Sequence, residues 1–325
     1  MEGEARQAAS RSFSEGWRPA PPNRRAFRVG FVAGATKTAG ALMPSALQFA
    51  VIIIEYAMAL CGLAYLGWLC LSERGRALRA RPVALKAWNV TVFDFLVLGW
   101  FVLSVGFVGQ LLLRAVAGPL PNTGSDKQTF ELLLYGVMFH FGAILSLPAS
   151  RALSRWRGAD VPQIPMPAAP ASLPREFRGS FLTFLVVMPL VGGASLVWER
   201  LLQTLGLPTE RQELVDLFLH AKSPALLVFL VVLALVVAPF SEELIFRAGI
   251  FRFLRSHGPR WVAFVVSAGL FALLHANWFS SLPLFILGLV FAAAYERTGR
   301  IAVPMLAHAL FNLNTLLLVL SGVGG

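Results

Sequence analysis

Charged side chains are scarce in this sequence. Asp, Glu, Lys and Arg make up 14% of the 325 residues, whereas hydrophobic types make up 57%. Soluble domains carry about 25% charged residues. The composition therefore argues against a soluble globular domain and predicts a protein that crosses the membrane several times.

Cysteine is also rare, and an apolar leader is missing. The two cysteines, Cys61 and Cys70, fall in one apolar stretch, so neither a disulfide framework nor a cysteine metal site is expected. The first 30 residues hold six arginines and no apolar core, which argues against a cleavable signal peptide. We expect residues 1–45 to form a basic, largely disordered tail.

Long apolar runs, by contrast, are abundant. A helical crossing needs roughly 20 apolar residues. Candidate stretches lie at 46–70, 91–114, 130–149, 180–204, 225–256, 260–281, 282–297 and 300–320. We therefore predict an all-α fold, a polytopic transmembrane bundle of about eight membrane helices with the active site in the C-terminal half. The fifth stretch is expected to break at Pro239, because an interior proline removes a backbone hydrogen bond.

A proline-rich segment divides the chain. Residues 158–174 contain five prolines and are predicted to be an extended linker. It separates an N-terminal transmembrane part, 46–157, from a catalytic core, 175–325. The net charge of +11 resides largely in loops between apolar runs, which is typical of membrane topology and not of nucleic-acid binding. We expect a multi-pass protein of the cell membrane, with its basic loops cytoplasmic and the lipid bilayer as its partner.

Several polar residues interrupt the apolar helices of this core. The set is Glu242, Glu243, Arg247, His275, His308 and Asn312. An intramembrane charge costs several kcal/mol unless it is paired or wetted, so this set indicates a functional site. Glu243 and Arg247 are four apart and can pair along one helix, whereas Glu242 is turned away by about 100°. Asn277 and Asn314 are expected only to pack between helices.

Two chemistries remain open for these residues. A carboxylate in a partly dry cavity can act as a general base on water, while imidazole and amide groups hold the water or stabilise an oxyanion. Alternatively, Glu242, His275 and His308 form a three-ligand zinc site with an open position for water. The sequence has no HExxH motif, so neither the metal-free nor the zinc alternative is excluded.

Three motifs in order carry a resemblance to a known family. EELIFR, FALLH and HALFN resemble the EExxxR, FxxxH and HxxxN motifs of the CPBP family. This family contains the type II CAAX prenyl endopeptidases and the Abi-like, bacteriocin-processing or immunity-associated membrane proteins. The resemblance covers about residues 180–320 and implies an intramembrane protease, often named as a metalloendopeptidase.

The resemblance also implies roles for the polar set. Glu242 would activate the water, and the Glu243–Arg247 pair would support it. His275 would position the water, while His308 and the asparagine of its motif would stabilise the oxyanion. The expected substrate is a membrane-embedded or lipidated peptide, such as a prenylated CAAX-like or small hydrophobic one. No certain cofactor is implied, and zinc or another divalent metal stays possible.

Two other functions fit the same residues. A proton-coupled transporter would use the glutamates and histidines as a relay. A catalytically inactive immunity or binding scaffold would keep the helices without the reaction. The sequence shows no inverted repeat, which counts against the transporter, and the complete set of motifs counts against the scaffold.

Overall fold

The computed structural model describes residues 45–117, 124–157, 173–207 and 223–323, together with Thr209 and Phe218. All regular elements in these ranges are helical, which confirms the predicted all-α class. The predicted basic tail lies outside the described residues, apart from Ser45, and so does most of the linker. Because α6 begins at Leu173, the last two residues of the predicted linker are helical.

The helices follow one another with short connections. They are α2 (Ala46–Leu71), α3 (Glu73–Ala80), α4 (Val92–Ala117), α5 (Gly124–Arg157), α6 (Leu173–Thr204), α8 (Pro224–Val232), η1 (Leu233–Val237), α9 (Ala238–Glu243), η2 (Leu244–Phe251), α10 (Arg252–His257), α11 (Arg260–Leu274), α12 (Trp278–Thr298) and α13 (Ala302–Ser321). In the described ranges, six helices are long and apolar enough to cross a membrane. The protein is therefore a multi-pass membrane protein.

The helix count differs from the predicted eight at two places. In α5 only Gly136–Ser146 is strongly apolar, so this long helix falls below the criterion for a crossing. The predicted span 260–281 ends early, because α11 stops at Leu274. Ala276 has a positive φ of 48°, which interrupts the helix. Asn277 then caps α12 by accepting a hydrogen bond from Ser280 N at 2.9 Å, so its predicted packing role is wrong.

The helix that carries the first motif is continuous, so the predicted break at Pro239 is wrong. Residues Pro224–His257 form one apolar helix in which α9 lies between two π-helical segments, η1 and η2. A π-helical turn is wider than an α-helical one and accommodates the irregular hydrogen bonding that proline imposes. Such turns are rare and frequently occur at functional sites.

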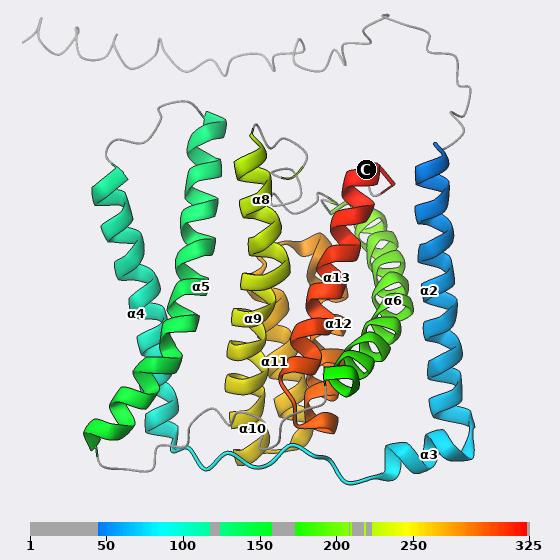
Figure 1. Cartoon of the computed structure of the whole chain (residues 1–325), viewed down its shortest axis with the longest axis horizontal. Coiled ribbons are helices and arrows are strands. Elements are labelled where there is room, and N and C mark those ends of the chain that lie inside the picture. The colour runs from blue at the N-terminus through cyan, green and yellow to red at the C-terminus, as the bar shows by residue number, and fades with distance from the viewer. Residues whose placement is uncertain are drawn as a thin grey trace, which may run out of the picture. The chain divides into compact units, whose positions relative to one another are not determined.

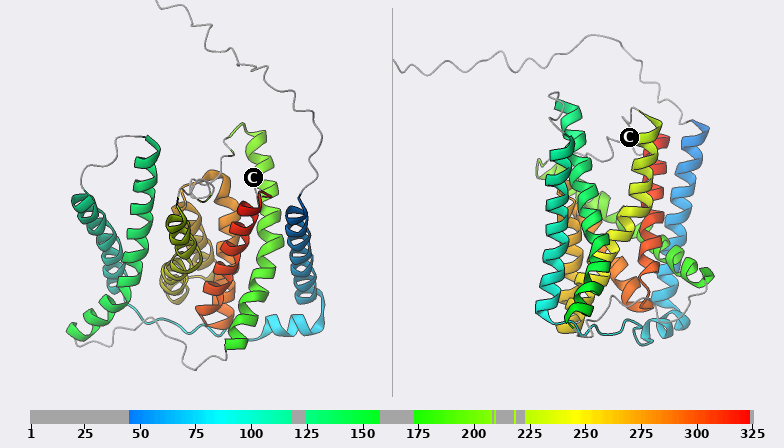
Figure 2. Two further views of the ribbon diagram at one scale, coloured as in Figure 1. Left: turned by 45° about the horizontal axis from the view of Figure 1, so that its top comes forward. Right: turned by 60° about the vertical axis from the view of Figure 1, so that its left-hand side comes forward.

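An apolar cluster occupies the centre of the core helices. Its members come from α6, η2, α11, α12 and α13: Phe184, Val187, Val191, Phe246, Phe271, Leu287, Phe291 and Ala307. Small residues allow close helix contact, as at Gly288, where an added Cβ would lie 2.9 Å from Ala268. Figure 1 shows α2 beside α6 and α4 beside α5, and Figure 2 gives two further views.

The connection between α3 and α4 is bound to the cytoplasmic ends of the core helices. Leu85 N donates to Glu296 O at 3.1 Å, and Trp88 N donates to Ser256 Oγ at 2.8 Å. Arg252 Nη2 donates to Lys86 O at 3.0 Å. These bonds tie the N-terminal helices to the core, although the division of the chain at the linker stays a prediction.

Candidate active site

Glu243 and Arg247 form the buried centre of the site. Their side chains are fully buried, and Arg247 Nη1 lies 2.8 Å from Glu243 Oε1, as the spacing of four residues predicts. The guanidinium also lies 4.4 Å from the centroid of Phe271, which favours the charged form. A buried pair of this kind is strongly destabilised when one partner is removed.

His308 of α13 lies between the two glutamates. Its Nδ1 is 2.9 Å from Glu243 Oε1, and its Nε2 is 3.8 Å from Glu242 Oε2. Because a carboxylate only accepts hydrogen bonds, we assign the proton to Nδ1, which leaves a lone pair on Nε2 in the neutral ring. The ring packs against Phe271 and Phe291, with centroids 5.9 and 5.3 Å away.

Glu242 differs from its neighbour in exposure and in bonding. Its side chain is 13% exposed, against 0% for Glu243. Its Oε2 is buried and has no hydrogen-bond partner among the residues that the structure describes. Two successive carboxylates therefore have different surroundings, one fixed in an ion pair and one open to a small ligand.

Asn312 is bound to the helix of the first motif. Its Nδ2 donates to the carbonyl oxygen of Ala234 at 2.8 Å. In a π-helical turn this carbonyl would pair with the residue five positions later, which is Pro239 and has no N–H. Asn312 thus compensates for the proline. One of its two amide protons is used in this bond, and the second is the one left for an oxyanion.

His275 is displaced from the place that the sequence predicts. It forms the C-cap of α11, whereas it was expected deep within a helix. Its Nδ1 lies 2.8 Å from the carbonyl of Phe271, so the ring is held by its own helix end. No hydrogen bond or ion pair joins His275 to either glutamate within the described ranges. The first and third motifs therefore contact each other directly, and the second is close to them without a polar contact.

One residue was missed by the sequence interpretation. His140 of α5, which falls in a predicted span, is buried, and its Nδ1 lies 2.6 Å from Ser241 Oγ, next to Glu242. Its ring interacts electrostatically with Glu242, His275 and His308. The available signal was a histidine at the centre of a predicted apolar span, where polar residues usually face the protein interior.

The three-ligand zinc alternative does not fit this geometry. In the described part of the chain, no three His, Cys, Asp or Glu side chains are grouped so that they could hold a metal ion. His308 is bound through Nδ1 to Glu243, and His275 does not join Glu242 and His308 in one cluster. We therefore derive no step through a metal.

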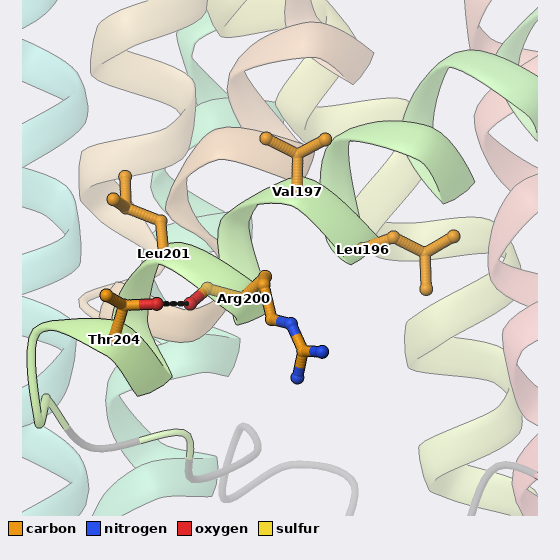
Figure 3. Close-up of a pocket in the computed structure, with 5 residues that line it drawn as sticks. All are labelled: Leu196, Val197, Arg200, Leu201 and Thr204. Atoms are coloured by element: carbon orange, nitrogen blue, oxygen red, sulfur yellow. Dashed lines mark hydrogen bonds between the residues drawn. The ribbon is translucent and has the colours of Figure 1, made fainter.

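A hollow on the surface of α6 is a separate feature. Figure 3 shows its five lining residues, all from this helix: Leu196, Val197, Arg200, Leu201 and Thr204. The hydroxyl of Thr204 donates to its own helix at Arg200 O. The hollow contains none of the motif residues, so it is not the candidate site.

Comparison with known proteins agrees with the three motifs. The family model described as Type II CAAX prenyl endopeptidase Rce1-like matches residues 224–314, which include all three. MroQ of Staphylococcus aureus, named a membrane-embedded CAAX protease, is 40% identical over 84 residues, 24% of this chain and 34% of that protein. YdiL of Bacillus subtilis, whose name describes a membrane peptidase, is 35% identical over 83 residues, 26% of this chain and 34% of YdiL.

A third relative, the UPF0177 protein YbdI of Lactococcus lactis, is 32% identical over 93 residues, 27% of this chain and 48% of YbdI. The chain thus matches less than half the length of each of these curated relatives. No solved structure matches at comparable significance. Through residues 224–314, with the motifs on three packed helices, the chain belongs to the CPBP family of membrane proteins that includes the type II CAAX prenyl endopeptidases.

Proposed function

We propose that this protein is an endopeptidase of the cell membrane that hydrolyses a peptide bond with a water activated by Glu242. The observation that carries the proposal is the buried Oε2 of Glu242, which lacks a partner among the described residues and lies 3.8 Å from His308 Nε2. A carboxylate at such a position is costly unless a ligand satisfies it. Water is the smallest ligand that does so.

The separation of these two atoms suits one shared water. A water at about 2.8 Å from each acceptor can donate one proton to Glu242 Oε2 and one to His308 Nε2. Its oxygen lone pairs then remain free to attack a carbonyl carbon. Arg247 balances the charge of Glu243, and Glu243 holds His308 in the tautomer that leaves Nε2 as an acceptor.

The proton balance of hydrolysis follows from this arrangement. Glu242 takes a proton from the water as the oxygen bonds to the carbonyl carbon, and the carbonyl oxygen becomes an oxyanion. The second amide N–H of Asn312 is the donor that we assign to this oxyanion. When the C–N bond breaks, Glu242 returns its proton to the leaving nitrogen. The products are a carboxylic acid and an amine.

The substrate class follows from the location of the site and from the family. Motif residues on apolar helices require a peptide that enters the bilayer, either as a hydrophobic segment or through an attached lipid. The relative MroQ is named a CAAX protease. We therefore extend the proposal to membrane-associated peptides, either prenylated CAAX-like or small and hydrophobic.

The test uses the full chain in proteoliposomes with two quenched fluorescent peptides, one ending in a farnesylated CAAX sequence and one hydrophobic and without lipid. We expect cleavage of at least one peptide, and Glu242→Gln should lower kcat about 100- to 10,000-fold, as for loss of a general base. Glu199→Gln is the matched control, because Glu199 bonds only to Gln203 of its own helix. It should cleave at the wild-type rate.

Each other result points to a different function. Equal activity of the Glu242→Gln variant and the wild type would refute the assignment of the base. Proton flux across the vesicles without cleavage would indicate the transporter, and neither activity would indicate the scaffold. Cleavage that stops on addition of a chelator and returns with zinc would contradict the metal-free reaction.

A further inference from the structure

His140 provides a link between the N-terminal helices and the active-site helix. It lies on α5, and its Nδ1 is 2.6 Å from Ser241 Oγ on α9, a separation of 101 residues in the chain. Both side chains are buried, Ser241 fully and His140 to more than nine-tenths. Ser241 directly precedes Glu242, so this contact fixes the turn on which the proposed base is carried.

The packing of α5 explains why this histidine faces the core. α5 packs against α4 closely, since an added Cβ on Gly142 would lie 2.5 Å from Val102 O, and one on Gly109 would lie 2.6 Å from Met138 Sδ. Met138 and Gly142 are four residues apart and share one face of α5. His140 lies midway between them in sequence and is therefore turned by about 200°, away from α4 and towards α9.

The hydrogen bonds of Ser241 define the tautomer of the ring. The single hydroxyl proton is donated to the carbonyl of Val237 at 2.7 Å. Ser241 Oγ must then accept from His140, so the proton lies on Nδ1 and the lone pair on Nε2. His140 is also within electrostatic range of Glu242, His275 and His308. The ring thus fixes Ser241 by donation and adds no positive charge to the site in this form.

We propose that His140 is a positioning residue of the active site, which acts through Ser241 to hold the turn of α9 that carries Glu242. This inference rests on the proposed peptidase function. It assigns a role to the N-terminal helix pair α4–α5, whose main contact with the core is through α9. The motif-bearing helices then form a complete site only when α5 is docked.

The test compares variants at both ends of the bond in the peptide cleavage assay. His140→Leu should lower kcat about 10-fold with KM within about 2-fold, as for the loss of one buried hydrogen bond that orients a catalytic group. His140→Asn places an amide N–H at the position of Nδ1 and should retain kcat within about 3-fold. Ser146→Ala is the matched control, because this buried hydroxyl of α5 bonds only within its own helix.

A double variant separates action through Ser241 from a general loss of stability. Ser241→Ala alone should resemble His140→Leu, and the two together should be no worse than about 10-fold, whereas independent effects would multiply to about 100-fold. A His140→Leu variant with wild-type kcat overturns the proposal. So does an effect that Ser146→Ala or the unfolding temperature reproduces fully.

A spectroscopic measurement tests the contact without catalysis. In 15N-histidine NMR of the full chain, the signals of the five histidines are assigned from single variants. His140 should be protonated on Nδ1 in the wild type, and this signal should shift in Ser241→Ala. A wild-type ring protonated on Nε2 alone overturns the inference. Expected signals in a protein that cleaves no peptide would uphold the contact and refute the peptidase function.

Discussion

Replacement of Arg247 by leucine should destabilise the protein more than the loss of any surface charge. Arg247 and Glu243 are both fully buried and lie 2.8 Å apart. Removal of the cation leaves an uncompensated carboxylate in the core, which costs about 3–5 kcal/mol. The guanidinium also loses its contact with the face of Phe271, which is worth about 1 kcal/mol. We expect Arg247→Leu to lose at least about 3 kcal/mol in the free energy of unfolding.

The double variant Glu243→Leu/Arg247→Leu separates stability from function. It leaves no buried charge at these positions, so its free energy of unfolding should return to within about 1 kcal/mol of the wild type or exceed it. Peptide cleavage should not return. His308 Nδ1 loses its acceptor, Glu243 Oε1, and a hydrogen bond to a charged group is worth about 1.5–3 kcal/mol, or roughly 10- to 150-fold in rate.

Unfolding by denaturant in detergent, followed by tryptophan fluorescence, gives the stabilities, and proteoliposomes give the rates. Arg255→Leu is the matched control. Its partner Glu296 keeps a second bond to Arg260, and Arg255 is a third exposed, so the loss should stay below about 1 kcal/mol. The reasoning fails if Arg247→Leu is as stable as this control. It also fails if the double variant is as unstable as the single one.

Two further predictions concern packing around the site. Asn312→Leu should cost about 1–3 kcal/mol by leaving the Ala234 carbonyl unpaired, and a smaller cost is expected in a Pro239→Ala background, where a backbone N–H is restored; equal costs in both backgrounds would contradict this. Gly288→Ala should cost about 1–3 kcal/mol, because the new Cβ would lie 2.9 Å from Ala268, and thermal unfolding that stays unchanged would refute the close contact.

The sequence by itself determined the class of the protein and its local contacts. Few charges and long apolar runs specify membrane helices, because each residue's cost in lipid is a property of that residue. The pairing of Glu243 with Arg247 was predictable, since it depends on one helical turn. The order of the three motifs was enough to indicate the family.

The tertiary structure decided how the motifs meet. His308 reaches Glu243 across 65 residues, and His140 reaches Ser241 across 101, so both contacts depend on how helices pack and not on local spacing. The local rule for proline predicted a break at Pro239, but Asn312 from another helix pairs with the Ala234 carbonyl that this proline leaves without a donor. Helical periodicity likewise placed His275 inside a span, whereas the cap at Asn277 ends that helix first. Contacts between distant segments thus overrode local preference at the positions where the site is built.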